Sequence, residues 1–180
     1  MVPPITMPAV RIVLLTGASS SGKTSIAKSL QSRLTQPFFH MQLDTFIEMM
    51  PRQDDDLFCA MVLGFHRSIA SMAGVGNNVI VDHVLLLPEW LQDCAQVLLD
   101  FKVLLVGVVC PLAELERREQ TRDVRRQGFA RSQFDRIHEG RTYDIEVCTD
   151  LFTPNECADQ ILQYYHTQTP SALAQVRSPQ

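Results

Sequence analysis

The sequence predicts an α/β fold in which a five-stranded parallel sheet carries helices on both faces. Short apolar segments alternate along the chain with longer segments whose apolar residues recur at helical spacing. The short segments are nearly continuous in apolar residues, which is typical of strands buried on both faces of a parallel sheet. Hydrophobic residues make up 46% of the 180 residues, enough for one core. Because no repeat or change in composition divides the chain, we expect a single domain over residues 1–180.

The first half of the chain predicts three strands and two helices. The run VRIVLLT at residues 10–16 is rich in branched residues and leads into a turn of glycine and serines. A helix follows over residues 23–35 and a short strand over 38–43. Residues 55–73 form a predicted long helix, because glycines at 74 and 76 end the pattern there. The third strand is predicted at 78–81, from the letters NVIV.

The second half continues the alternation. Pro88 opens a predicted helix over residues 89–99, and the strongly apolar run at 101–109 is the fourth strand. Two charged helices, 111–126 and 129–139, join at a glycine. A weak last strand at 145–149 completes the predicted sheet, and a closing helix follows over residues 155–166. We expect a flexible tail over about 169–180.

Composition narrows the function classes. Sixteen Lys+Arg against twenty Asp+Glu leave a net charge of −4, which provides no general field for nucleic acid or an anionic membrane. The longest apolar run, at 79–88, is broken by Asp82 and His83 and is too short to span a bilayer. The five cysteines are odd in number and form no C-x-x-C pair, which indicates reduced thiols. We therefore expect a cytoplasmic protein without nucleic-acid or membrane partners; its oligomeric state cannot be predicted.

The strongest motif fits G-x-x-x-x-G-K-[ST] and lies between a predicted strand and a predicted helix. Such a loop turns successive backbone N–H groups toward phosphate oxygens, its lysine reaches the β- and γ-phosphates, and its hydroxyl binds Mg²⁺. A solvated Ser/Gly-rich loop is the alternative, but the flanking elements favour a nucleoside triphosphate site. The predicted ATP-binding residues are Gly17, Ala18, Ser19, Ser20, Ser21, Gly22, Lys23 and Thr24.

Two aspartates follow the second and third predicted strands, at the edge where ligands of parallel sheets bind. Asp44 can accept the proton of an attacking hydroxyl and direct its oxygen at the γ-phosphate, or it caps a short helix over residues 45–50. Asp82 is a candidate Mg²⁺ ligand with Thr24 and can also position the acceptor. Met41 and Phe46 lie near Asp44 in sequence, so we predict that they contact the acceptor or pack in the core.

Arginines gather late in the chain, in a stretch that we call the lid (about residues 117–135). Phosphoryl transfer needs positive charge over the transferring oxygens, which a closing lid can bring. We predict nucleotide contacts for Arg118 and Arg122, and catalytic roles for Lys23, Arg122 and Arg125. Neighbouring glutamates such as Glu114 and Glu116 offer these arginines an alternative, as ion pairs on a solvated helix face.

The strings TGASSSGKTS, LDTFIEMMP and VIVDHVLLL, with the lid and last strand, resemble the chloramphenicol phosphotransferases from about residue 11 to residue 149. That resemblance implies a P-loop kinase fold with an arginine-rich lid and ATP-dependent phosphorylation of the antibiotic's 3-hydroxyl. It also implies that Asp44 is the general base. The family's aspartate after the third strand falls on Asp82. Its positions in the lid and before the last strand fall on Arg118, Arg122, Arg125, Gly128, Ala130, Gln133, His138, Tyr143 and Asp144.

Three departures from the family pattern lie near the acceptor side. Cys148 stands where an acidic residue is common, His83 stands where a second aspartate can occur, and the segment after Met50 is shorter. They leave ATP use untouched and leave the acceptor open. The alternatives are a kinase of another small metabolite, such as a sugar, nucleoside or sugar acid, and a nucleotide-binding regulatory module.

Overall fold

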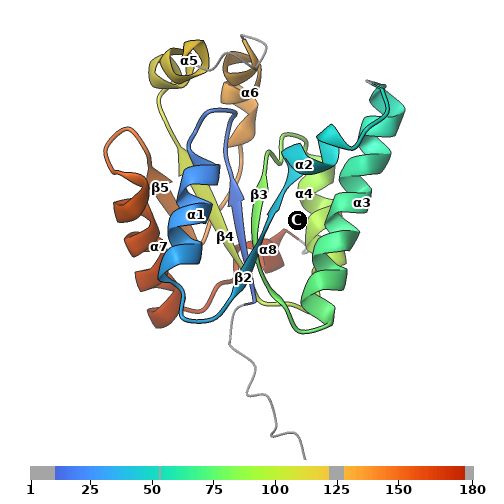
Figure 1. Cartoon of the computed structure of the whole chain (residues 1–180), viewed down its shortest axis with the longest axis vertical. Helices are drawn as coiled ribbons and strands as arrows, with labels where there is room; N and C mark the ends of the chain where they lie inside the picture. Colours follow the sequence, from blue (N-terminus) through green and yellow to red (C-terminus); the bar gives the residue numbers. More distant parts are fainter. Residues whose placement is uncertain (1–10, 53, 122–127, 177–180) are drawn as a thin grey trace, which may run out of the picture.

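The computed structural model describes residues 11–52, 54–121 and 128–176. Its sheet contains β1 (Ile12–Thr16), β2 (Phe38–Gln42), β3 (Asn78–His83), β4 (Val103–Val109) and β5 (Ile145–Cys148). The strand order is β2-β3-β1-β4-β5, and every neighbouring pair is parallel. The predicted α/β fold with a five-stranded parallel sheet is confirmed (Figure 1).

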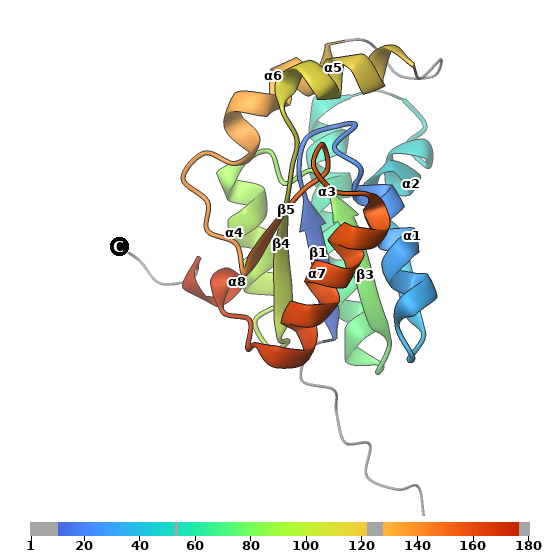
Figure 2. The same cartoon turned by 90° about the vertical axis from the view of Figure 1, so that its left-hand side faces the viewer.

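Helices cover both faces of this sheet (Figures 1 and 2). On one face lie α1 (Lys23–Arg33) and α7 (Pro154–Thr167), and on the other lie α3 (Asp55–Gly74) and α4 (Pro88–Val97). The short helix α2 (Leu43–Glu48) follows β2, while α5 (Leu112–Gln120) and α6 (Phe129–Ile137) lie beyond the carboxyl edge. Parallel strands bring all their carboxyl ends to that one edge, which is where the sequence motifs meet.

The apolar run of β1 explains its central place. All five of its residues are buried, and they alternate between the two faces because successive strand side chains point to opposite sides. Ile12 and Leu14 pack in the core under α3 and α4. Val13 and Leu15 pack in the core under α1 and α7. A strand with two buried faces needs an unbroken apolar sequence, and that requirement produced the run seen in the sequence.

Strand β3 is two residues longer than predicted. Its last residues pair with both neighbours, since Asp82 lies opposite Leu15 of β1 and Gln42 of β2, and His83 lies opposite Thr16. Asp82 and His83 therefore belong to the strand itself rather than to the loop after it. Their side chains consequently point to opposite faces of the sheet.

Helix α2 corrects one alternative for Asp44. The helix begins at Leu43 with Gln42 as its N-cap, so Asp44 lies within the first turn and is not the cap. A carboxylate in the first turn still interacts favourably with the positive end of the helix dipole. The cap interpretation of Asp44 was wrong because the helix starts directly at the end of β2.

The expectation of a flexible tail from residue 169 was also wrong for part of that segment. Ala172–Gln175 form a short helix, α8, and Ala172 and Leu173 are buried in the core under α3 and α4. Asp144 holds this helix in place. Its Oδ1 accepts hydrogen bonds from the backbone N–H groups of Ser171 and Ala172, and its Oδ2 accepts one from Leu105 of β4. The few apolar residues of this short segment gave no periodic signal, so the docking could not be predicted from the sequence.

Helix α3 is longer than the run at 79–88 that the sequence analysis considered as a membrane span. By length and composition alone its 20 residues could cross a membrane, a test that the core helix of a soluble protein also passes. In the structure its buried residues are Val62, Phe65, His66, Ile69 and Ala73, spaced along the face that meets β3 and α4.

Replacing Asp144 tests the docking of α8. Asp144→Ala removes the acceptor of three backbone N–H groups, and since a hydrogen bond to a charged group is worth about 1.5–3 kcal/mol, we expect a loss of about 3 kcal/mol in the free energy of unfolding. Urea denaturation measures this loss. The exposed Asp100→Ala is the control and should change stability by less than about 0.5 kcal/mol. Equal stability of the two variants would contradict this account of α8.

Candidate functional site

The glycine- and serine-rich loop of residues 17–24 connects β1 to α1 at the carboxyl edge. A side chain at Gly17 would come within 2.3 Å of the Val108 carbonyl oxygen, so only glycine fits there. Gly22 has φ +93°, and Ser20 has φ 64°, a conformation that residues other than glycine rarely adopt. Backbone held in this way directs consecutive N–H groups into one concavity, which suits an anion. The start of α1 adds the positive end of its dipole.

Lys23 carries a buried positive charge in this loop. Its side chain is only 6% exposed, and its Nζ donates hydrogen bonds to the carbonyl oxygens of Gly17 and Ala18, both at 2.9 Å. The loop therefore closes around the ammonium group. Two other polar atoms of the loop, the hydroxyl oxygens of Ser20 and Ser21, are buried without a hydrogen-bond partner in the described part of the chain. Buried hydroxyls of this kind require a partner, and a phosphate oxygen would supply one.

Thr24 and Asp82 meet across the pocket. The Thr24 hydroxyl donates to Asp82 Oδ2 at 2.5 Å. Burial raises the pKa of Asp82, but His40, the Lys23 charge and the Thr24 hydroxyl together outweigh burial and lower it, so the carboxylate is ionised. The pair joins an anionic and a neutral oxygen donor, which is the set that Mg²⁺ takes from proteins when phosphates and water complete its coordination. The residues present therefore fit a magnesium ion.

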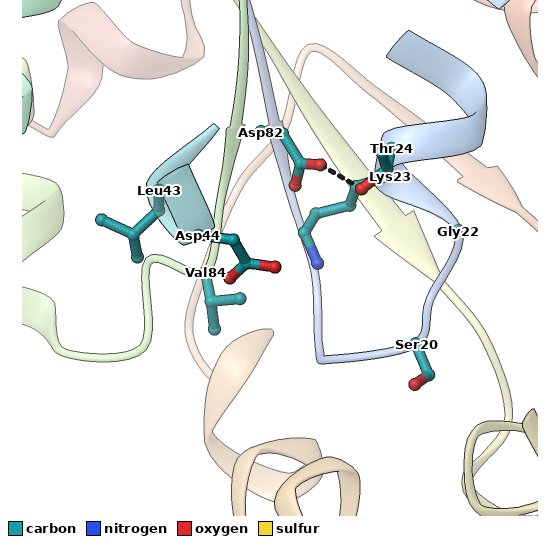
Figure 3. Close-up of a pocket in the computed structure, with 8 residues that line it drawn as sticks. All are labelled: Ser20, Gly22, Lys23, Thr24, Leu43, Asp44, Asp82 and Val84. Atoms are coloured by element: carbon teal, nitrogen blue, oxygen red, sulfur yellow. Dashed lines mark hydrogen bonds between the residues drawn. The ribbon is translucent and has the colours of Figure 1, made fainter. Parts of the chain in front are cut away.

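Asp44 faces this loop. Figure 3 shows its carboxylate directed toward Lys23, in a pocket lined also by Ser20, Gly22, Thr24, Leu43, Asp82 and Val84. Of the predicted acceptor residues, the structure brings Asp44 and Asp82 together here. Met41 and Phe46 pack against the core, and the rings of Phe46 and Phe65 meet edge-to-face with their centroids 4.8 Å apart. Leu43 and Val84 were not predicted, since apolar residues beside a motif carry no signal of their own.

The lid arginines divide into two groups. Arg117 and Arg131 form ion pairs with Glu114 and Glu116 on exposed helix faces, so the solvated alternative is confirmed for them. Arg118 also bonds to Glu114, but it continues inward to the phosphate loop. Arg122 and Arg125, the two predicted catalytic arginines, lie outside the described residues.

Thr149 connects Arg118 to the loop. Its hydroxyl donates to the Ser21 carbonyl oxygen and accepts from an Arg118 N–H group, while a second Arg118 N–H group donates to the Thr149 carbonyl oxygen at 2.7 Å. This places the Arg118 guanidinium beside Gly22. The sequence analysis missed Thr149, and its only signal was its position directly after the last strand.

Tyr143 and His138, two of the positions matched to the family, contact the sheet and the end of α6 rather than the pocket. The ring of Tyr143 lies flat against Gly107, where a side chain would come within 2.6 Å of it. The Tyr143 hydroxyl lies 2.8 Å from His138 Nδ1 and donates to the Ile137 carbonyl oxygen. Burial raises the pKa of Tyr143 to about 12, so this hydroxyl remains protonated and fixes the end of α6.

A hydrogen-bonded chain of three polar side chains runs from His83, the residue after Asp82, through His66 to the partly exposed Asp93. His66 Nδ1 donates to Asp93 Oδ2 at 2.7 Å, and His66 Nε2 lies 2.9 Å from His83 Nε2. Both histidines are fully buried. Since the Asp93 carboxylate only accepts, His66 Nε2 carries a lone pair and His83 Nε2 carries the proton. The sequence analysis missed His66 and Asp93, because their pairing requires α3 and α4 to lie side by side.

Further metal sites are absent from the part of the chain that the structure describes. There, no three His, Cys, Asp or Glu side chains gather as a metal-binding group. All five cysteines belong to this part and are unpaired.

Comparison with known proteins agrees with this geometry. The profile described as "Chloramphenicol phosphotransferase-like protein" matches residues 10–166. The chain belongs to this family. Two relatives come from Mycobacterium tuberculosis, strains CDC 1551 and H37Rv, and both are named "Putative O-phosphotransferase". Each is 29% identical to this chain over 188 aligned residues. The alignment covers 88% of this chain and 84% of the relative. Family membership makes the chain a phosphotransferase of the kinase type.

Solved structures share the fold at low identity. The M. tuberculosis APS kinase CysC, in complex with AMPPNP and APS, aligns with a TM-score of 0.66 and 18% identity over 89% of this chain and 99% of its own. A gluconokinase from Sinorhizobium meliloti 1021 aligns with a TM-score of 0.64 and 15% identity over 89% and 93%. The chloramphenicol phosphotransferase-like chain thus has the P-loop kinase fold that the sequence predicted.

The buried histidine chain predicts a loss of stability in mild acid. Burial lowers the pKa of His66, although Asp93 opposes this and Arg67 adds to it, with His83 on its other side. Below the usual histidine pKa of about 6.5, the unfolded chain takes up a proton that the folded chain does not, so stability falls as pH decreases.

His66→Gln removes this proton uptake while keeping a donor and an acceptor. We expect the difference in unfolding free energy between pH 7.5 and pH 5.5, measured in urea, to be smaller in this variant than in the wild type. His166→Gln, at an exposed histidine, should keep the wild-type difference. An unchanged difference in His66→Gln would be evidence against a neutral buried His66.

Proposed function

We propose that this protein transfers the γ-phosphate of ATP to a hydroxyl group of a small molecule, with the 3-hydroxyl of chloramphenicol as the first acceptor to test. The observation that supports this most is the meeting of Asp44, Lys23, Thr24 and Asp82 in one pocket at the carboxyl edge of the sheet. Family membership supports the phosphotransferase class, and the M. tuberculosis relatives are named for transfer to oxygen.

The phosphate loop supplies the binding of the nucleotide in this proposal. Its N–H groups and the two seryl hydroxyls bond to phosphate oxygens, and Lys23 exchanges the carbonyls of Gly17 and Ala18 for the β- and γ-phosphates. Thr24 and the ionised Asp82 hold Mg²⁺, which when bound neutralises charge on those phosphates. Arg118 lies on the other side of the loop, beside Gly22, where it contacts the nucleotide.

Asp44 acts on the acceptor. It orients the hydroxyl and takes its proton as the hydroxyl oxygen bonds to the γ-phosphorus, the bond to the β,γ-bridging oxygen breaks and ADP leaves. Lys23, which faces Asp44 across the pocket, keeps positive charge next to the reacting phosphoryl group. Arg122 and Arg125 of the lid complete this neutralisation.

A second candidate is a kinase for another hydroxylated metabolite on the same site. It is favoured by His83, which stands where the family can have an aspartate and is bound in the buried chain to His66 rather than offered to an acceptor. A panel of chloramphenicol, a sugar, a nucleoside and a sugar acid, each incubated with ATP and Mg²⁺ and analysed by mass spectrometry, separates the two. Phosphorylation of none of them, with ATP hydrolysis that depends on a protein partner, would favour a regulatory module. The unpaired cysteines suit a reducing compartment, and we place the reaction in the cytoplasm.

Asp44→Asn should abolish transfer and leave nucleotide binding nearly intact. Loss of a general base costs about 10²–10⁴-fold in kcat, and the amide keeps the shape of the side chain. Steady-state transfer to the best acceptor gives kcat, and calorimetry gives the affinity for ATP. Glu48→Gln, an exposed carboxylate at the end of the same helix, is the control and should retain full activity. Equal loss of ATP binding and transfer in Asp44→Asn would instead assign Asp44 a structural role.

Thr24→Ala tests the magnesium site independently of turnover. Removing the hydroxyl leaves Asp82 as the only described protein ligand, so we expect Mg²⁺ to increase ATP affinity much less in the variant than in the wild type. Titrations of ATP with Mg²⁺ and with EDTA measure this increase. The same increase in both proteins would exclude Thr24 as a magnesium ligand.

A further inference from the structure

The side chain of Gln133 in the lid bonds directly to the phosphate loop. Its Oε1 accepts a hydrogen bond from the backbone N–H of Ser19 at 2.7 Å. Ser19 lies in the middle of the loop and is only 5% exposed. Gln133 belongs to α6, and 114 residues separate it from Ser19. The contact therefore joins two parts of the site that the chain brings together only by folding.

Helix α6 is held firmly at this contact. Ala130 and Ile137 are fully buried and pack with Ala18 of the loop, and Phe134 and Val84 lie against the same cluster. Glu119 of α5 is also buried, and its carboxylate accepts hydrogen bonds from the backbone N–H groups of Gly128 and Ala130 at the start of α6. Gln133 thus lies on a helix that is held in place by this packing and by the hydrogen bonds of Glu119.

The chemistry of the contact matches that of phosphate binding. The N–H groups of such a loop are its donors to phosphate oxygens, and the carbonyl oxygen of a glutamine is a neutral acceptor of the same kind. Two hydroxyl oxygens next to Ser19 in sequence, those of Ser20 and Ser21, are buried without a partner among the described residues. The loop therefore has one donor, the Ser19 N–H, that bonds to Gln133. Beside it are two hydroxyls, of Ser20 and Ser21, that a bound ligand could contact.

The position of Ser19 indicates which phosphate is concerned. Thr149 and Arg118 flank the other end of the loop, at Ser21 and Gly22. On the Ser19 side, the neighbouring Ala18 packs in one cluster with Val84, and Val84 lines the pocket together with Asp44. Through Ala18 and Val84, this side of the loop lies next to the pocket in which a hydroxyl held by Asp44 would meet the transferring phosphoryl group.

We propose that Gln133 recognises the terminal phosphate of the nucleotide. Its amide oxygen occupies the Ser19 N–H until a γ-phosphate oxygen takes that donor, and its amide N–H₂ then donates to the same phosphate. Gln133 thereby distinguishes a nucleoside triphosphate from a diphosphate. This assignment rests on the proposed function, since it requires the loop to bind a nucleotide.

The test compares affinities for AMPPNP and ADP, measured by calorimetry in the presence of Mg²⁺. A hydrogen bond to a charged group is worth about 1.5–3 kcal/mol, so Gln133→Ala should lower the ratio of AMPPNP to ADP affinity by about tenfold or more. Gln133→Glu keeps the size of the side chain but places a carboxylate against the phosphate, so the ratio should fall further. The affinity for ADP should change little in either variant.

Ser132→Ala is the matched control, because the Ser132 hydroxyl is exposed on the same helix and, among the described residues, bonds only to the Phe129 carbonyl oxygen of its own turn. It should keep the wild-type ratio, and thermal unfolding shows that all three variants fold. An unchanged ratio in both Gln133 variants, or an equal loss of both nucleotides, would overturn the assignment and leave Gln133 a structural contact. A wild-type protein that binds neither nucleotide would overturn the proposed function and this assignment with it.

Discussion

The buried ammonium group of Lys23 is the constraint on which the site depends. A charge that is 6% exposed needs close polar partners, and the loop provides them by wrapping its own carbonyl oxygens around the side chain. That wrapping demands the positive φ of Ser20 and Gly22 and the absence of a side chain at Gly17. The surrounding elements then hold the loop in place, β4 against Gly17, Thr149 at Ser21 and Gln133 at Ser19. The strain of the loop is thus maintained by the end of the sheet and the base of the lid.

The distribution of charge around the pocket matters more than the net charge of the protein. The net charge of −4 describes the surface as a whole, whereas the pocket places Lys23 next to two carboxylates, Asp44 and Asp82. Asp82 remains ionised despite burial because Lys23, Thr24 and His40 stabilise its charge. Arg118 adds positive charge at the opposite side of the loop, beside Gly22. The site therefore combines positive charge, which suits phosphates, with two carboxylates, which suit a metal ion or a hydroxyl donor.

Local sequence was sufficient for much of the fold. The loop motif and the apolar runs at β1 and β4 need only neighbouring residues to be recognised, and the predicted sheet and its P-loop were correct for that reason. The features that were missed depend on contacts across the fold. Docking of α8 requires Asp144 to meet Ser171 and Ala172, and the histidine chain requires α3 to lie beside α4. The bonding of Arg118 to Thr149 follows the same rule, because 31 residues separate them.

The central claim is that the present partners of Lys23 and Thr24 hold places that a nucleotide and a metal ion take over. A crystal structure with AMPPNP and Mg²⁺ bound tests this most directly. We expect the triphosphate in the loop, Lys23 Nζ moved from the carbonyls of Gly17 and Ala18 to phosphate oxygens, and the Thr24 hydroxyl bonded to Mg²⁺ instead of Asp82. A structure with the nucleotide elsewhere, or with Lys23 still on the two carbonyls, would contradict the account.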